Sequence, residues 1–352
     1  MLVISGNEMQ KDAEKIYFMN QSLKILPYGQ NILNAWPEEC FLFSLMNSIP
    51  NGINWVMDSV IQLSMYTSSD VPQGLVSFDP FVKHHQLING MDFNPFITKY
   101  HIDKKLLNSF CDDFDKIIIN AINNDYYIST MFDMRILLQC NTKEKFHASY
   151  IYGYDLDNNV YHLNDNFYNG KNSKEQFSFT LVKKAYKACL GEKFVDLGNT
   201  AVCFYKIREN INYDFSNEKL KGNIKRFLNS IPSQTNCDSA YVWGISILEY
   251  MRESISNIGN QKIDIRNFAF LLDYANLNCR RVEFLIQRNK IINALKILEE
   301  IKKQYRQCSI LLQLCIKYNI TGRKEIIDNI VKNLDDFYFT EKKVLENLCE
   351  LI

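Results

Sequence analysis

Residues 146–166, FHASYIYGYDLDNNVYHLNDN, carry the strongest structural signal in this chain. The apolar and aromatic run at 148–154 is typical of a largely buried strand. Turn-forming residues fill positions 155–159, and a second strand pattern begins at Val160. The stretch therefore predicts a β-hairpin, and the rest of the sequence can be interpreted outward from it.

Two polar side chains frame this hairpin. His147 opens the first strand and Asp165 closes the second. In an antiparallel ribbon these positions are neighbours, because the chain runs out and comes back. A His beside an Asp is half of a relay that activates a nucleophile. From the hairpin alone, a purely structural role for both residues is an equal alternative.

The amino-acid composition indicates which class of protein this chain belongs to. The 352 residues suggest about two domains, and 47% hydrophobic residues provide ample material for a core. Forty basic and forty acidic residues give a formal charge of zero, so the sequence predicts no nucleic-acid partner and no anionic membrane surface. No signal peptide or membrane-spanning run is apparent, which favours a cytoplasmic protein. The ten cysteines show no metal-binding spacing and are expected to be reduced thiols.

Residues 1–212 are predicted to form an α+β domain with an antiparallel sheet. Pro37 and the acidic pair after it suit the first turn of a buried helix. The tandem pair His84-His85 is interpreted as surface, because adjacent residues on a regular element do not face one site. The other predicted elements are strands at 2–4, 15–18, 126–138 and 200–207, helices at 53–65, 102–123 and 183–190, an irregular stretch at 66–94 and a loop at 170–174.

Residues 213–352 have a different residue pattern, with almost no sequence typical of strands. Broad apolar stripes at helical spacing predict an all-helical C-terminal domain, most simply a bundle. Gly, Pro and the pair Asp335-Asp336 are interpreted as the joints between helices. The predicted helices span residues 218–231, 239–255, 265–288, 291–318, 324–334 and 340–351.

Cys40 falls in or near the first turn of the helix that begins at Pro37. The positive end of the helix dipole favours a thiolate there, although Glu38 and Glu39 act in the opposite direction. For any single one of ten cysteines, a buried structural thiol is the better interpretation. The order along the chain is nevertheless typical of a papain-like cysteine-protease fold. A Cys on a buried helix comes first, followed by a His and an Asp on a hairpin.

The hairpin also resembles a known family. The strand HASYIYGYD matches the pattern H-x-x-x-x-x-G-Y-D, and the second strand ends in Asp165-Asn166. With Cys40 on a central helix, residues 30–208 resemble the N-terminal domain family named after BtrH, the butirosin-biosynthesis acyltransferase. They resemble more distantly the bacteriocin-leader peptidases that share its papain-like fold. The segment STMFDMRIL also resembles the family's preceding strand, with Asp133 at its acidic position.

Two features depart from the pattern. Papain-like enzymes commonly carry a Gln upstream of the Cys as an oxyanion donor, whereas this chain offers Asn34, six residues upstream, and Gln30, ten residues upstream. The peptidases follow their Cys with small residues, whereas Phe41 and Phe43 follow Cys40 here. A bulky apolar lining leaves less room for an extended peptide and excludes water, which favours another acyl acceptor.

The resemblance implies an acyltransferase that forms amide bonds in specialised metabolism, such as antibiotic or nonribosomal-peptide assembly. An acyl or peptidyl group would arrive on the phosphopantetheine arm of a carrier protein, move to Cys40, and leave on a small amine. His147 would exchange protons and Asp165 would hold its tautomer, while Asn34, together with the backbone N–H of Cys40, would stabilise the oxyanion. No bound cofactor or metal is implied, and the helical half would dock the carrier or shape an acyl tunnel.

Two alternatives stay open at this stage. A cysteine peptidase or thioesterase would use the same triad with water as the acceptor. A non-catalytic binding protein would carry the three residues by coincidence. Trapping with a thiol-directed reagent separates the second alternative, because a catalytic Cys40 is expected to react far faster than the other nine cysteines.

Overall fold

The computed structural model describes residues 21–79, 94–141, 145–168, 170–190, 201–232, 240–288 and 295–352. The predicted strands at 2–4 and 15–18 and the pair His84-His85 lie outside these ranges. The chain divides into two compact units, which are described separately. The first comprises Met1–Pro27, Thr98–Phe167 and Ser173–Ile207, and the second Tyr28–Ile97, Tyr168–Asn172 and Arg208–Ile352.

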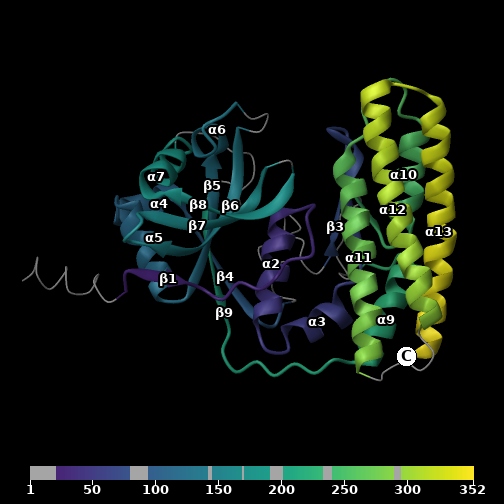
Figure 1. The fold of residues 1–352 in the computed structure, drawn as a ribbon, viewed down its shortest axis with the longest axis horizontal. Helices are drawn as coiled ribbons and strands as arrows, with labels where there is room; N and C mark the ends of the chain where they lie inside the picture. Colours follow the sequence, from purple (N-terminus) through teal and green to yellow (C-terminus); the bar gives the residue numbers. More distant parts are fainter. Residues whose placement is uncertain are drawn as a thin grey trace, which may run out of the picture. The chain divides into compact units, whose positions relative to one another are not determined.

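A seven-stranded sheet, counted over the described residues, is the centre of the first unit (Figure 1). Its strand order is β4-β9-β5-β6-β7-β8, and β1 pairs with β6 beside this path. The pairs β1–β6, β5–β6, β5–β9 and β6–β7 are antiparallel, as predicted. The strands are β1 (Leu23–Ile25), β4 (Ile97–Asp103), β5 (Tyr126–Asp133), β6 (Phe146–Asp155), β7 (Val160–Tyr168), β8 (Lys171–Ser178) and β9 (Ala201–Ile207).

Aromatic side chains pack the helices of this unit against one another and onto its sheet. The rings of Phe114 and Tyr186 lie 4.3 Å apart between centroids, and those of Tyr161 and Phe179 lie at the same distance. Such pairs stabilise a core beyond their buried area, by about 0.5–1.5 kcal/mol each. The helices are α4 (Lys104–Phe110), α5 (Phe114–Asn123), α6 (Met134–Leu137) and α7 (Phe179–Lys187), and α5 and α7 contact β5.

The hairpin predicted from the sequence is β6 and β7. Its turn is built as the residue types indicate: Asp155 accepts a hydrogen bond from the Asn158 backbone at 3.0 Å, and Asn159 has a positive φ of 54°. Gly153 of the Gly-Tyr-Asp triplet pairs with Ile25 of β1. A Cβ on Gly153 would lie 2.9 Å from the carbonyl oxygen of Lys24, so the close approach of β1 requires glycine here.

The second unit combines the Cys40 helix, a small antiparallel sheet and the C-terminal helices. The sheet has the strand order β10-β2-β3. The long helices α11, α12 and α13 run alongside one another in Figure 1, with α12 in contact with both others. The elements are α2 (Pro37–Ser48), α3 (Gly52–Ser59), β2 (Leu63–Ser68), β3 (Val71–Phe78), α9 (Asn217–Leu228), β10 (Tyr241–Trp243), α10 (Ser246–Ser256), α11 (Ile265–Gln287), α12 (Leu295–Thr321) and α13 (Glu325–Leu351).

This grouping differs from the predicted division into residues 1–212 and 213–352, because residues 28–97 belong with the C-terminal helices. Buried polar side chains of α11 hold them there. Arg281 donates from Nε to the carbonyl oxygen of Met57 at 2.8 Å and from Nη2 to that of Val60 at 2.5 Å. A buried charged group must find hydrogen-bond acceptors, so these contacts tie α3 to α11.

Several predicted boundaries were wrong. The pair Asp335-Asp336 does not interrupt α13, because the buried stripe continues through it and Asp335 pairs with Arg252 at 3.2 Å. The predicted helix at 102–123 is two helices, since Asp113 caps the start of α5 by accepting from the Asp115 backbone. The predicted helix at 239–255 begins instead with strand β10.

The region around residue 70 shows the largest difference from the prediction. The end of the predicted helix at 53–65 and the start of the irregular stretch at 66–94 form the hairpin β2–β3. The burial of β3 alternates as in a half-buried strand, but its Pro72 and Gly74 are typical loop residues and conceal this pattern. The predicted loop at 170–174 likewise belongs largely to β8, and the strand predicted at 126–138 ends at Asp133, where α6 begins.

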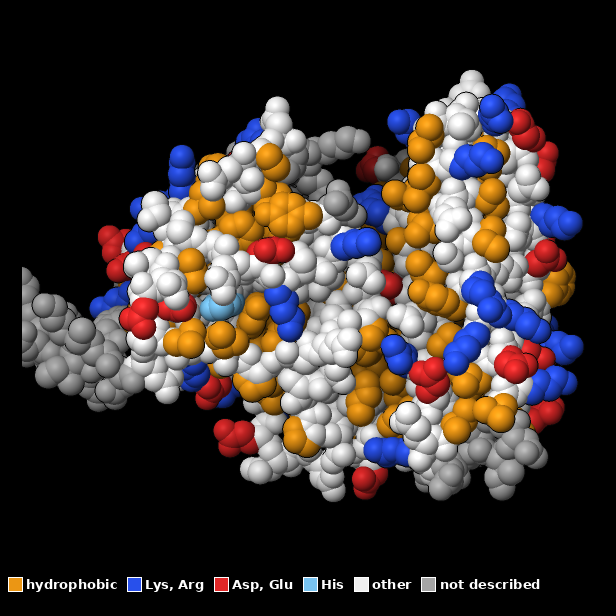
Figure 2. All heavy atoms as spheres, viewed as in Figure 1, with side chains coloured by type: hydrophobic (Ala, Val, Ile, Leu, Met, Phe, Trp, Pro, Cys, Tyr) orange, Lys and Arg blue, Asp and Glu red, His pale blue; other side chains and the backbone are white. Residues whose placement is uncertain are grey.

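The surface of the long helices carries exposed apolar side chains. Figure 2 shows them along the C-terminal helices, where α12 exposes Leu295, Ile310, Ile316 and Ile320. Exposed apolar residues are common on folded proteins and need no partner to explain them. No helix within the described ranges has both the length and the apolar character needed to cross a bilayer.

Glu341 gives the helical region a predicted pH dependence. The side chain is 1% exposed and accepts a hydrogen bond from the Tyr274 hydroxyl at 2.6 Å. Burial raises the pKa of Glu341 from 4.5 to about 7. The folded state then binds a proton more readily than the unfolded state, so this contribution to stability is complete below pH 4.5 and is lost as the pH rises through 7.

We therefore expect Glu341→Gln to flatten the decline in unfolding free energy between pH 5 and 8, by about 3 kcal/mol. Urea denaturation of wild type and variant at pH 5 and at pH 8 measures this difference in unfolding free energy. Other buried carboxyls affect both proteins equally, so an identical decline in the two would contradict the assignment.

Candidate functional site

The hairpin β6–β7 brings His147 and Asp165 together, as the sequence predicted. Tyr150 pairs with Asn164 across the two strands, which places Ser149 beside Asp165 one step further along the ladder. Side chains two residues apart on a strand share a face, so His147 lies on the same face as Ser149. His147 Nδ1 and Asp165 Oδ2 are 2.8 Å apart. Asp165 does not end its strand, however, since β7 continues to Tyr168.

Asp165 is held from several sides. Its side chain is fully buried, with 0% exposure. Ser149 Oγ donates to Oδ2 at 2.6 Å, and the Asn166 backbone N–H donates to Oδ1 at 2.6 Å. Hydrogen bonds to a carboxylate oppose the cost of burying its charge. The carboxylate therefore has a fixed orientation toward the imidazole.

His147 is suited to exchange protons. Its side chain is 30% exposed, so the ring combines a buried partner with partial access. With Nδ1–H donating to the Asp165 carboxylate, proton transfer to and from this ring would run through Nε2. A charged imidazole would be stabilised by the carboxylate beside it. The pair has the geometry of the base and orienting groups of a nucleophile-activating relay.

Cys40 lies in the first turns of α2, as predicted, and is fully buried. It belongs to the second unit, whereas His147 and Asp165 belong to the first. Its backbone N–H donates to the carbonyl oxygen of Trp36 at 2.9 Å, which is an ordinary helical bond. The expectation that this N–H serves as an oxyanion donor is therefore not supported, because the helix already uses it.

The two predicted oxyanion residues both lie ahead of α2 and are exposed. The backbone N–H of Asn34 donates to Asp273 Oδ2 at 2.6 Å. The carbonyl oxygen of Gln30 accepts a bond from Asn47 Nδ2 at 2.9 Å. Of the two, Asn34 has its backbone held by a buried side chain.

Asp133, which the family resemblance singles out, has a structural explanation. It ends β5 and caps α6, where its Oδ1 accepts from the Arg135 backbone at 3.0 Å. The Arg135 guanidinium donates to Oδ2 at 3.0 Å, and these contacts lower the pKa of Asp133. Asp133 therefore acts as a helix cap and ion-pair partner.

Two features escaped the sequence interpretation. Ser149, the hydroxyl that binds Asp165, could have been found from its spacing, because it lies two residues after His147. A thiol–imidazole contact joins Cys203 Sγ of β9 and His101 Nδ1 of β4, at 3.5 Å. These residues are 102 positions apart, so no local sequence pattern indicates that they pair.

Lys104 interacts electrostatically with the Cys203 thiol. It is buried, and burial lowers the pKa of its amine to about 8, against the raising effect of Cys189 and Cys203. A thiol beside an imidazole is a rival nucleophile in any thiol-trapping experiment. Labelling must therefore distinguish Cys203 from Cys40.

Within the described ranges, no group of three or more His, Cys, Asp or Glu side chains is placed to hold a metal ion. The chain was also compared with known proteins. No protein-family model matches it, and a search of curated proteins returned no match.

Proposed function

We propose that this protein is a cysteine-dependent acyltransferase with a papain-like fold, similar to the BtrH N-terminal domain family. It would transfer an acyl or peptidyl group from a carrier-protein thioester to an amine. The observation that carries the proposal is the His147–Asp165 pair, in which a fully buried carboxylate bonds a partly exposed imidazole at 2.8 Å. Cys40 at the start of α2 supplies the nucleophile in this mechanism.

The proposed reaction has two half-reactions. In the first, the Cys40 thiol gives its proton to His147 Nε2, and the thiolate attacks the thioester carbonyl. The tetrahedral intermediate expels the phosphopantetheine thiolate, which takes the proton from the imidazolium. Exchange between two thioesters is nearly isoenergetic, so loading needs no external energy source.

In the second half-reaction, an amine attacks the acyl-Cys40 thioester. His147 accepts the proton that the nitrogen loses and returns it to the departing Cys40 sulfur. The products are an amide and the free enzyme. Asp165 stabilises the imidazolium in both halves and keeps the proton-bearing tautomer at Nδ1. An amide donor such as Asn34 would stabilise the oxyanion by about 3–4 kcal/mol.

The surroundings of the nucleophile favour an amine over water. Phe41 and Phe43 follow Cys40 on α2 and are 0% and 2% exposed. An apolar environment excludes water and protects a reactive thioester from hydrolysis. A peptidase or thioesterase with the same three residues would instead have to admit water.

The test is incubation of the protein with an acyl-carrier thioester, with and without a small primary amine. We expect intact-protein mass spectrometry to show one acyl group on Cys40 without amine, and amide product when amine is added. Rapid release of free acid regardless of amine would favour the thioesterase. Absence of any acyl adduct, together with absence of product, would refute the acyl-enzyme mechanism.

A further inference from the structure

The segment that leads into α2 is held by helix α11, more than 200 residues away in the sequence. Asp273 Oδ2 accepts two consecutive backbone N–H groups, from Asn34 at 2.6 Å and Ala35 at 2.7 Å. One turn further along α11, Asn276 Nδ2 donates to the carbonyl oxygen of Ile32 at 3.1 Å. Three backbone groups within four residues are thus fixed by two side chains of one helix.

Burying the Asp273 carboxylate at this position costs free energy. It is 5% exposed, and burial raises its pKa to about 6. The carboxyl of Glu39, in the first turn of α2, is also buried and interacts electrostatically with Asp273, so charging both groups together would be unfavourable. An uncharged acceptor would satisfy a backbone N–H at lower cost. A charged acceptor binds two N–H groups more strongly and with tighter geometry.

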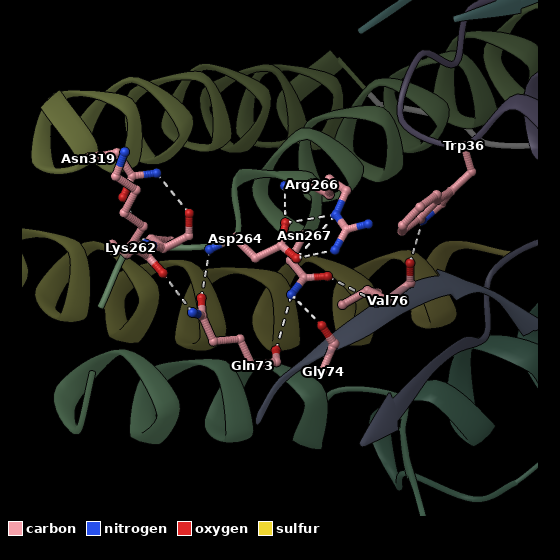
Figure 3. A network of polar contacts seen from close by, with 10 residues as sticks. Trp36, Gln73, Gly74, Val76, Lys262, Asp264, Arg266, Asn267 and Asn319 are labelled. Atoms are coloured by element: carbon pink, nitrogen blue, oxygen red, sulfur yellow. Dashed lines mark hydrogen bonds and ion pairs between the residues drawn. The ribbon is translucent and has the colours of Figure 1, made fainter. Parts of the chain in front are cut away.

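The same helix also anchors the residue at the start of α2. Figure 3 shows Trp36 donating from its indole nitrogen to the carbonyl oxygen of Val76, at 2.6 Å. The Asn267 side chain of α11 holds that strand, since its Oδ1 accepts from the Val76 backbone at 3.0 Å. The guanidinium of Arg266 lies 5.6 Å from the centre of the Trp36 ring. Helix α11 therefore secures both the segment and its junction with α2.

We infer that Asp273 is a positioning residue for the acyl-transfer site: it fixes residues 32–35 so that Asn34 is presented ahead of Cys40. This inference rests on the proposed function. Fixing the backbone of Asn34 limits where its side chain can reach, and the side-chain amide carries two N–H donors that an oxyanion could accept. The C-terminal helices would then serve the reaction by holding this segment.

The test compares Asp273→Ala and Asp273→Asn with wild type. We expect Asp273→Ala to speed amide hydrogen exchange at Asn34 and Ala35 by about 10-fold or more, because both N–H groups lose their acceptor. Acyl loading of Cys40 from a carrier thioester should slow on the order of 100-fold, as expected for a misplaced catalytic group, with KM for the carrier little changed. Asp273→Asn keeps an acceptor oxygen and should recover most of both properties.

Asn319→Ala is the matched control, because Asn319 makes two bonds to the backbone of Ile263, at 2.8 Å each, and none to residues 32–36. Figure 3 includes this contact. The control should lower stability without selective exchange at Asn34 and Ala35. Unchanged exchange in Asp273→Ala would overturn the positioning role, whatever the loading rate. Faster exchange with an unchanged loading rate would show that the contact is structural only.

Failure of the proposed function can be distinguished from failure of the positioning role. If wild type forms no acyl adduct and no product, the acyl-transfer role of Asp273 falls with the proposed function. The exchange measurements would still show whether Asp273 holds residues 32–35.

Discussion

Replacement of Cys40 by alanine is expected to abolish covalent acyl loading. Wild-type protein mixed with an acyl-carrier thioester should gain the mass of one acyl group, whereas Cys40→Ala should gain none. No other group in the proposed site can form the thioester, because His147 and Asp165 act on protons. The variant should still fold, since replacing one small buried side chain costs only about 1 kcal/mol. Intact-protein mass and thermal unfolding measure the two properties.

Cys203→Ala is the matched control for this experiment. Cys203 is also buried, and its sulfur lies 3.5 Å from a histidine nitrogen, so among the described cysteines it is a plausible competing nucleophile. We expect this variant to load acyl groups at the wild-type rate. If Cys40→Ala formed product as fast as wild type, the covalent mechanism would be wrong, and direct attack of the amine on the carrier thioester would have to replace it.

Loss of the imidazole is expected to have the second-largest effect. His147→Ala should reduce both acyl loading and amide formation by about 10²–10⁴-fold, because the thiol loses its base and the amine its proton acceptor. His162, which lies on the same hairpin and is 8% exposed, offers a control. Burial lowers the pKa of His162, and His162→Gln should leave the loading rate nearly unchanged. Equal losses in the two variants would indicate damage to the hairpin instead.

Asp165→Asn tests the carboxylate separately. The amide fills the same space but does not stabilise an imidazolium, and it can favour the wrong tautomer. We expect a smaller loss in acyl loading than in complete turnover, since amine attack depends on proton transfer away from nitrogen. Single-turnover loading and steady-state amide formation give the two rates. A variant that turned over like wild type would remove Asp165 from the mechanism.

The hairpin and its polar pair could be predicted from the sequence alone. His147 and Asp165 are 18 residues apart, and the alternation of side chains on strands places them on one face once the turn is located. The α+β class and the largely helical C-terminal region also follow from local periodicity. Local patterns fail where loop-like residues occupy a strand, as at Pro72 and Gly74, or where a buried stripe overrides an acidic pair, as at Asp335-Asp336.

The parts of the chain that fold together could be identified only in the folded protein. The Cys40 helix belongs with the C-terminal helices because buried groups such as Asp273 and Arg281 find their partners more than 200 residues away. A buried charge must be paired, but its own sequence neighbourhood does not reveal the acceptor or donor. The same holds for Cys203 and His101, which neighbouring strands bring within 3.5 Å. Periodicity reports which face of an element is buried, whereas the choice of partner depends on the packing of the whole chain.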